Sequence, residues 1–162
     1  MTVNLQIAKM ENALAAYLQA FEKMQPDNFD HLLEPLLAKS IYFQDPLNKV
    51  DGVPATLAIF QHMFDTLENP QFTILHHCLC ACNSHLDKHC TALVHWEFRF
   101  VLNGKRQQFE GTSQITLDAN YKICRHVDFW DAGEHIYSQI PIVGWAIRQI
   151  KKRLASPLVN TK

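Results

Sequence analysis

The 162-residue chain has no long apolar run, no strong net charge and no regular cysteine framework. Its longest uninterrupted apolar stretch, residues 141–147, is far shorter than the roughly 20 residues of a membrane-spanning helix. The N-terminal segment has no basic start followed by an apolar core and small residues, so it does not resemble a signal peptide. We therefore expect a soluble, cytoplasmic protein.

The charges are nearly balanced, with 15 Lys and Arg against 16 Asp and Glu and a formal net charge of -1. This balance argues against the overall basic field by which many proteins collect nucleic acid, so no nucleic-acid partner is expected. Five cysteines without a framework spacing predict free thiols in a reducing compartment. The length and a hydrophobic content of 48% suit one well-buried core.

Four of the five cysteines and four of the nine histidines lie in one stretch, HHCLCACNSHLDKHC. Zinc sites use short spacings such as C-x2-C, whereas this stretch reads C-x-C-x-C. On an extended strand Cys78 and Cys82 would lie about 13 Å apart, too far for one ion. Cys82 and Cys90 could still meet across a hairpin beside a histidine. A β-hairpin with small thiols on one face is the favoured interpretation, and no metal is expected.

Apolar side chains recur at steps of three and four in the N-terminal third, a spacing typical of amphipathic helices. This predicts a helix over about residues 4–24 with Tyr17 on its buried side, and a short one over about 29–37. The run SIYFQD, residues 40–45, predicts a short strand. A third helix is expected after an Asp-Gly turn, with its apolar positions at Leu57, Phe60, Phe64 and Leu67.

From Gln71 onward the pattern changes to an antiparallel meander with regularly spaced turn residues. Asn103-Gly104 is the strongest local signal, because a two-residue type I′ turn needs positive φ at both positions. This turn fixes the register of one hairpin and places an apolar set on a single face. The predicted pairs on that face are Phe98 with Phe109, Trp96 with Gly111, Val94 with Ser113, and Ala92 with Ile115. The opposite face receives Arg99 with Gln108, Glu97 with Glu110, and His95 with Thr112.

The following hairpin can be threaded in the same way with Ala119-Asn120 as its turn. Its predicted pairs are Ile115 with Cys124, Ser113 with His126, Gly111 with Asp128, and Phe109 with Trp130. This register turns His126 and Asp128 toward the inner apolar face and Val127 and Phe129 outward. A change of one residue in the turn would reverse the assignment.

With this order of elements, the chain resembles the SnoaL-like and ketosteroid-isomerase-like superfamily, which shares the nuclear transport factor 2 fold. The resemblance covers about residues 5–135 and rests on YFQDPLNKVDGVPA and on HVDFWDAGEH. It implies an α+β fold in which a strongly curved antiparallel sheet forms a cone around N-terminal helices, with a pocket at its open end. It also implies a homodimer that forms through the outer face of the sheet.

The resemblance to ketosteroid isomerase assigns roles to individual positions. The base that abstracts the proton matches Asp45, and the tyrosine of the oxyanion hole looks like Tyr17. The second oxyanion donor, a carboxylic acid in that enzyme, is matched by Ser113, whose hydroxyl is a weaker donor. Steroid isomerisation is therefore not implied. The pocket-lining positions of the last strand correspond to His126, Asp128 and Trp130.

We therefore expect a pocket for a small, largely apolar molecule, with proton transfer next to a carbonyl and no cofactor. The catalytic candidates are Asp45, Asp128, His126 and Tyr17, and the ligand-pocket candidates are Ser113, Trp130, Trp96, Phe98, Phe109, Phe43, Phe60 and Phe64. Hydrolysis of an epoxide or ester by paired carboxylates, and a non-catalytic ligand- or partner-binding module, remain open. Asp45 could equally cap a turn, and Asp128 with His126 could form a structural pair.

The C-terminal segment, IPIVGWAIRQIKKRLAS, predicts an amphipathic helix with an apolar stripe beside basic residues. We expect the cone-shaped domain to cover residues 1–138 and this basic helix and tail to cover 139–162. Packing against its own domain, docking on a partner protein and peripheral contact with an anionic membrane are all compatible with the pattern.

Overall fold

A computed structural model describes residues 2–80, 89–102, 104–137 and 141–154. The chain divides into two compact units, Met1–Trp130 and Asp131–Lys162. Unit 1 contains α1 (Thr2–Lys23), α2 (Phe29–Leu33), the 3-10 turn η1 (Glu34–Leu36), β1 (Leu37–Gln44), β2 (Lys49–Asp51), α3 (Val53–Thr66), β3 (Glu68–Leu79), β4 (Cys90–Leu102), β5 (Lys105–Leu117) and β6 (Ile123–Phe129). Unit 2 contains α4 (Ala132–His135) and α5 (Pro141–Leu154).

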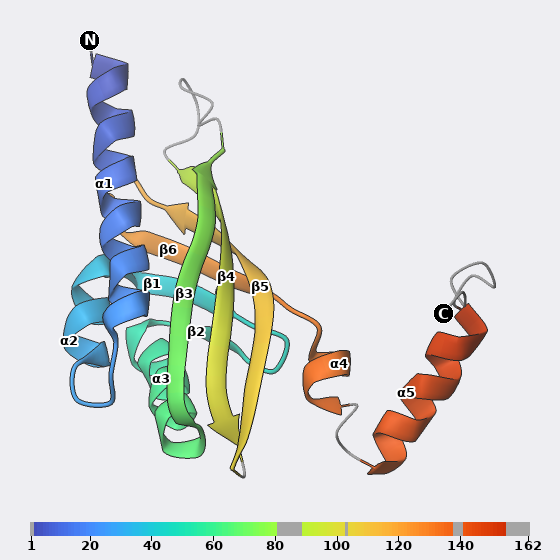
Figure 1. The fold of residues 1–162 in the computed structure, drawn as a ribbon. Coiled ribbons are helices and arrows are strands. Elements are labelled where there is room, and N and C mark those ends of the chain that lie inside the picture. Colours follow the sequence, from blue (N-terminus) through green and yellow to red (C-terminus); the bar gives the residue numbers. More distant parts are fainter. Residues whose placement is uncertain (1, 81–88, 103, 138–140, 155–162) are drawn as a thin grey trace. The chain divides into compact units, whose positions relative to one another are not determined.

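The strands of unit 1 form one six-stranded sheet in the order β2-β1-β6-β5-β4-β3. Figure 1 shows the long strands β3, β4 and β5 crossing the direction of β1, β2 and β6, so the sheet is strongly curved. All neighbours pair antiparallel except β1 and β6, which pair parallel. The expected α+β fold is confirmed, but the sheet is mixed rather than purely antiparallel.

The helices of unit 1 supply one side of its apolar core. Tyr17 and Leu14 from α1 and Phe60 from α3 are buried together with Trp96 and Ile115 from the sheet. The first helix follows its prediction closely, whereas the second ends at Leu33 and continues only as η1. Pro35 lies in that turn and has no backbone N–H, so it cannot continue the α-helical bonding. β1 therefore starts at Leu37, earlier than predicted.

The register of the β4–β5 hairpin is the one that the Asn-Gly turn predicts. Gly104 has a φ of +71°, as a type I′ turn requires, while Asn103 lies outside the described residues. The confirmed pairs are Phe98 with Phe109, Trp96 with Gly111, Val94 with Ser113, Ala92 with Ile115, Arg99 with Gln108, Glu97 with Glu110, and His95 with Thr112.

The predicted register of the β5–β6 hairpin is wrong by two residues. Ser113 pairs with Asp128 rather than His126, and Ile115 pairs with His126 rather than Cys124. Leu117 is followed by a five-residue loop in which the Asp118 carboxylate accepts hydrogen bonds from two backbone amides, Asn120 and Lys122. This loop shifts the register by one residue, and an irregularity between Thr116 and Leu117 shifts it by another. Because the total shift is even, His126 and Asp128 still face inward.

The outer face of β6 was expected to expose Val127 and Phe129, and it differs from this expectation at Val127. Phe129 is 56% exposed on the outer face, as predicted, but Val127 is buried there. Glu97, another outer-face residue, is also buried, and it pairs with Arg99 at 2.6 Å and accepts a hydrogen bond from Gln108. The outer face is therefore less open to solvent than its polar pattern predicts.

The cysteine-rich stretch falls on the β3–β4 hairpin, whose strands pair antiparallel as predicted. Cys82 and the predicted turn at 83–84 lie outside the described residues. Cys78 is exposed and Cys124 half-buried, and both are free thiols. Cys90 is buried and disulfide-bonded, so the expectation of free thiols is wrong at this position.

Unit 2 consists of a single-turn helix and a longer C-terminal helix. α4 begins at the Asp131 cap, whose carboxylate accepts a hydrogen bond from the backbone N–H of Glu134. α5 confirms the predicted amphipathic helix over the residues that the structure describes. Within those residues, neither unit has a helix with the length and apolar content needed to cross a bilayer.

Candidate functional site

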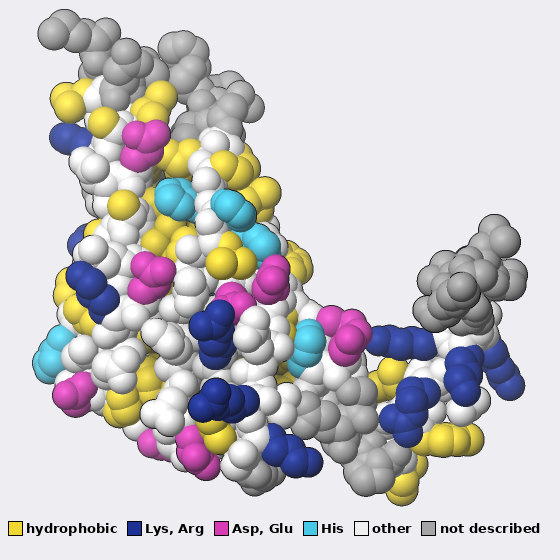
Figure 2. Space-filling model, viewed as in Figure 1, with side chains coloured by type: hydrophobic (Ala, Val, Ile, Leu, Met, Phe, Trp, Pro, Cys, Tyr) yellow, Lys and Arg dark blue, Asp and Glu magenta, His cyan; other side chains and the backbone are white. Residues whose placement is uncertain are grey.

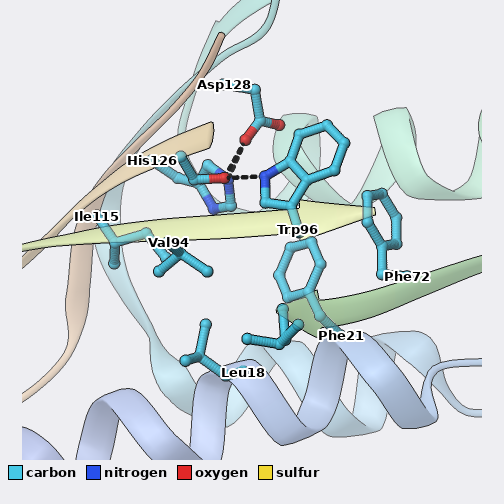
Figure 3. A pocket seen from close by; sticks show the side chains of 10 residues that line it. Leu18, Phe21, Phe72, Val94, Trp96, Ile115, His126 and Asp128 are labelled. Carbon is cyan, nitrogen blue, oxygen red and sulfur yellow. Dashed lines mark hydrogen bonds and ion pairs between the residues drawn. The ribbon is translucent and has the colours of Figure 1, made fainter. Parts of the chain in front are cut away.

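A small cavity lies between α1 and the inner face of the sheet. Its free volume is about 10 Å³, close to the space of one water molecule. Figure 3 shows His126, Asp128 and Trp96 on the sheet side, opposite Leu18 and Phe21 of α1. The lining residues are Leu18, Phe21, Phe72, Ile74, Val94, Trp96, Ser113, Ile115, His126 and Asp128. The interior at this point is therefore nearly filled, and this cavity is much smaller than the ligand pocket that the resemblance implies.

A continuous chain of polar side chains runs along this cavity. The Trp96 indole N–H donates to Ser113 Oγ at 2.7 Å, and the Ser113 hydroxyl donates to Asp128 Oδ1 at 2.5 Å. His126 Nε2 lies 2.7 Å from the same Oδ1, and its Nδ1 lies 2.8 Å from the Tyr17 hydroxyl. Residues of α1, β4, β5 and β6 are thereby joined through one carboxylate.

The partners of His126 determine how its ring is protonated. A carboxylate only accepts hydrogen bonds, so Nε2 carries the proton that is donated to Asp128. In the neutral ring Nδ1 then accepts, and the Tyr17 O–H donates to it. Burial, and secondarily the negative charge of Asp128, raise the pKa of Tyr17 well above its ordinary value. Tyr17 therefore remains a neutral donor at physiological pH.

Among the hydrogen-bonded side chains along the cavity, Asp128 has a carboxylate oxygen left to contact a ligand. Both hydrogen bonds that the described residues make to its carboxylate go to Oδ1. Its side chain is 13% exposed, whereas that of His126 is 3% exposed with both ring nitrogens engaged. Asp128 Oδ2 can thus accept a proton from a bound molecule, while His126 acts on a ligand only through Asp128.

Aromatic rings pack around His126 on three sides. The ring centroids of Phe43, Phe21 and Tyr17 lie 5.1, 5.4 and 5.8 Å from that of His126. The parallel pairing of β1 with β6 sets Phe43 directly beside His126. Electrostatic interactions are stronger in such a low-dielectric setting than in water, so the charge of Asp128 acts strongly on its neighbours.

The structure places Asp45 in a tight turn after β1. Its Oδ1 accepts hydrogen bonds from the backbone amides of Leu47 and Asn48, both at 2.6 Å, and Oδ2 accepts from the Asn48 side chain at 2.9 Å. Asp45 does not line the cavity, although it directly follows Gln44, which pairs with Val127 beside Asp128. The carboxylate is therefore occupied in the way a turn-capping aspartate is.

Most of the aromatic residues expected around the ligand form the core beside the cavity rather than its lining. Trp96 and Ser113 do line it. Phe98 stacks on Phe72 at 4.3 Å, and Phe109 stacks on Trp130 at 4.9 Å. Two further candidates do not line the cavity but pack on neighbouring core rings: Phe60 on Phe43, and Phe64 on Phe29.

Six lining residues were not among the predicted site residues: Leu18, Phe21, Phe72, Ile74, Val94 and Ile115. The predicted register had placed the last two on the inner face without assigning them to the pocket. Phe21 could have been found, because it is one helical turn from Tyr17 on the same apolar stripe. Ile74 could not, because β3 has a register irregularity at this point and the Ile74 amide bonds to the Glu22 carboxylate of α1 at 3.0 Å.

A polar cluster of His76, His95 and Glu110 lies apart from the cavity, on the outer face. His95 Nε2 lies 2.7 Å from Glu110 Oε2, and the His95 and His76 rings stack at 6.0 Å. Across the described ranges, no group of three or more His, Cys, Asp or Glu is arranged to hold a metal ion.

The sequence of residues 14–126 matches the model of the SnoaL-like domain family. This match spans well over half of the chain. The chain belongs to the SnoaL-like family. No curated protein matches it.

Solved structures of distant SnoaL-like and related proteins share the fold. A nuclear transport factor 2-like superfamily protein from Salmonella enterica has a TM-score of 0.61 at 18% identity, covering 80% of this chain and 92% of its own. A candidate polyketide cyclase from Xanthomonas campestris has a TM-score of 0.59 at 15% identity, covering 78% and 93%. An LEH-like epoxide hydrolase from M. tuberculosis has a TM-score of 0.58 at 14% identity, covering 87% and 97%. At these identities the likeness concerns the fold alone.

Proposed function

We propose that this SnoaL-like protein binds a small, largely apolar carbonyl compound and transfers a proton at the carbon next to the carbonyl. Asp128 is the general base. The observation that carries the proposal is the carboxylate itself, with Oδ1 held by Ser113 and His126 and Oδ2 left for a ligand beside an apolar cavity. The names of related folds, a candidate cyclase and an epoxide hydrolase, are compatible with acid–base chemistry at this place.

In the proposed step the C–H bond breaks, its proton moves to Asp128 Oδ2, and the electron pair is delocalised into the carbonyl as an enolate. In a substrate with a double bond one carbon further along, delivery of a proton from Asp128 to the far end of that double bond completes an isomerisation and regenerates the carboxylate. Exchange of the Asp128 proton with water between the two steps brings solvent hydrogen into the product. Ser113 and His126 keep the carboxylate in one orientation, which a reacting geometry requires. Tyr17 is a positioning residue that acts through His126.

Binding requires that side chains around the cavity move, because it holds about one water molecule in this structure. β3 is the edge strand of the sheet and carries Phe72 and Ile74, both only half-buried. The Glu22 carboxylate holds the Ile74 amide from α1. We expect a ligand to enter by displacing these two β3 side chains rather than by disturbing the central strands.

Hydrolysis is the second candidate, favoured by a cavity that matches one water beside a carboxylate. Asp128 would then take a proton from that water, whose oxygen attacks a carbon of an epoxide or ester. A C–O bond of the substrate breaks, and the departing oxygen takes the proton from Asp128, which regenerates the carboxylate. The two chemistries leave different products, so one assay separates them. A ketone substrate would exchange hydrogen without net addition of water, whereas an epoxide would be converted to a diol.

The experiment begins with a thermal-shift screen of small ketones, lactones and epoxides, since a ligand that binds only the folded state raises Tm. Hits are then tested for turnover with the wild type, D128N and D45N. The amide oxygen of D45N can still accept the two backbone hydrogen bonds of its turn, so it is a matched control. Hits that bind but are not turned over by the wild type would instead make the protein a binding module.

We also propose a homodimer through the outer face of β4, β5 and β6, as the family resemblance implies. Leu93 and Phe129 are 43% and 56% exposed on this face and lie on either side of β5. Phe129→Glu should convert a dimer to a monomer in sedimentation analysis. Leu47→Glu, a similar change at an exposed apolar residue of the β1–β2 turn, should leave the dimer intact. A monomeric wild type would refute this proposal.

A further inference from the structure

The helix α5 has features that the acid–base site does not use. Its apolar residues follow helical spacing along one side, and three basic residues, Arg148, Lys151 and Lys152, lie on the other. Four large apolar side chains of the helix are strongly exposed: Ile142 and Leu154 at 81%, Trp145 at 60% and Ile150 at 57%. Figure 2 shows Lys and Arg side chains gathered along this helix next to apolar ones.

The sign of the net charge changes from negative to positive shortly before α5. All 16 acidic residues lie at or before Glu134, together with ten of the 15 basic ones, which gives residues 1–134 a formal charge of -6. Residues 135–162 contain five basic residues and no acidic one, a formal charge of +5. A net charge near zero thus conceals a strongly cationic C-terminal segment.

The cations of α5 are largely uncompensated within unit 2. Lys151 lies 3.1 Å from Glu134 and 4.0 Å from Asp131. For Arg148, Lys152 and Arg153 no ion pair occurs within the described residues. Three cations therefore have no ion-pair partner among the described residues of unit 2, and they lie on the same helix as the exposed apolar side chains.

We propose that α5 binds the surface of a bilayer that contains anionic lipids, lying in the plane of the interface. A basic amphipathic helix with exposed Trp and aliphatic residues buries its apolar side at the headgroup boundary, and its cations contact lipid phosphates and carboxylates. The helix has 14 residues, about 21 Å at 1.5 Å per residue, so it lies on the membrane rather than crossing it. Trp145, beside the basic side, suits the boundary between headgroups and acyl chains.

The function of this contact would be to bring the acid–base domain to an apolar substrate dissolved in the membrane. The acidic remainder of the chain would be repelled by the same surface, so attachment would depend on α5. The attachment does not require the proposed chemistry, and the two can fail independently.

The test is sedimentation of the full chain with vesicles of phosphatidylcholine alone and of phosphatidylcholine with 30% phosphatidylserine. We expect binding to the anionic vesicles only, weakened by high salt. R148E/K152E should lower the binding constant at least about tenfold, because each juxtamembrane cation contributes substantially to binding. K105E/R106E makes the same change of charge at two exposed residues of unit 1 and should bind like the wild type.

Fluorescence gives a second readout in the same samples. Anionic vesicles should shift the emission of the wild type to the blue, and W145F should lose this shift while Trp96 and Trp130 remain. Equal binding to both vesicle types, no binding, or equal loss in both double variants would overturn the proposal. Absence of binding with a lowered Tm in Ile150→Ser would show that α5 packs on the protein, and absence of binding with an unchanged Tm would favour a protein partner.

Discussion

Two carboxylates at neighbouring strand ends, Asp45 after β1 and Asp128 on β6, have opposite surroundings. Both oxygens of Asp45 accept hydrogen bonds within its own turn. Asp128 has one oxygen bonded to Ser113 and His126 and the other left beside an apolar cavity. The family motif points to the first, whereas the geometry supports the second. The comparison teaches that the hydrogen bonds already made by a carboxylate decide whether it can serve as a base.

The largest expected effect is on turnover by the two asparagine variants. D128N should lower kcat at least about a hundredfold while the ligand still raises Tm, because the proton acceptor is lost and the shape is kept. D45N should stay within about threefold of the wild type. Steady-state kinetics with any hit of the screen measures both, and the opposite ranking would restore Asp45 as the base.

Gly111→Ala should disturb the surroundings of Asp128 and leave the Asp45 turn unchanged. A Cβ at this position would lie 2.4 Å from two carbons of the Trp96 ring, so the indole that supports Ser113 must move. We expect a loss of about 1–3 kcal/mol in the free energy of unfolding, measured by denaturant titration. Adding Trp96→Phe to Gly111→Ala should recover part of this lost stability. If the losses of the two single variants simply add in the double variant, the contact between residue 111 and the Trp96 ring is not the cause.

Because Tyr17 is buried beside Asp128, we expect the protein to lose stability at alkaline pH. Its pKa is raised in the folded state, so its contribution is fully present below the ordinary tyrosine pKa of about 10 and is lost as pH rises beyond it. The free energy of unfolding should fall by up to ~1.4 kcal/mol per pH unit there, and Y17F should lack this fall. The control is Tyr121→Phe, at a half-exposed tyrosine, which should keep the wild-type slope.

The smallest effect concerns the proposed entry route at β3. Glu22→Ala removes the carboxylate that accepts from the Ile74 amide, so this amide should exchange its hydrogen about twofold to tenfold faster. The amide of Phe43, on the internal strand β1 beside the same site, should be unaffected. An unchanged rate at Ile74 would mean that this contact does not hold the edge strand.

The sequence predicted well where a local signal fixes the geometry. Asn103-Gly104 set every predicted pair of the β4–β5 hairpin, because a two-residue turn leaves no freedom of register. In the next hairpin, the Asp118 loop and the irregularity at Thr116 each add a one-residue shift. The inward orientation of His126 and Asp128 was therefore right, while their predicted partners were wrong.

Other features of the site arise from contacts between distant segments. The parallel pairing that sets Phe43 beside His126 joins strands about 80 residues apart, and no local pattern specifies it. The near-filling of the cavity depends on how Phe21 and Phe72 pack, with their ring centroids 5.4 Å apart. The family resemblance correctly implied the cone, but the hydrogen bonds of Asp45 became evident only from the folded turn.

The central claim, that Asp128 Oδ2 takes the proton, is tested most directly by deuterium incorporation. A ketone identified by the screen is incubated with enzyme in D2O, and its hydrogens next to the carbonyl are followed by NMR. We expect incorporation with the wild type and D45N, and at least a hundredfold slower incorporation with D128N. Incorporation at the wild-type rate with D128N would contradict it.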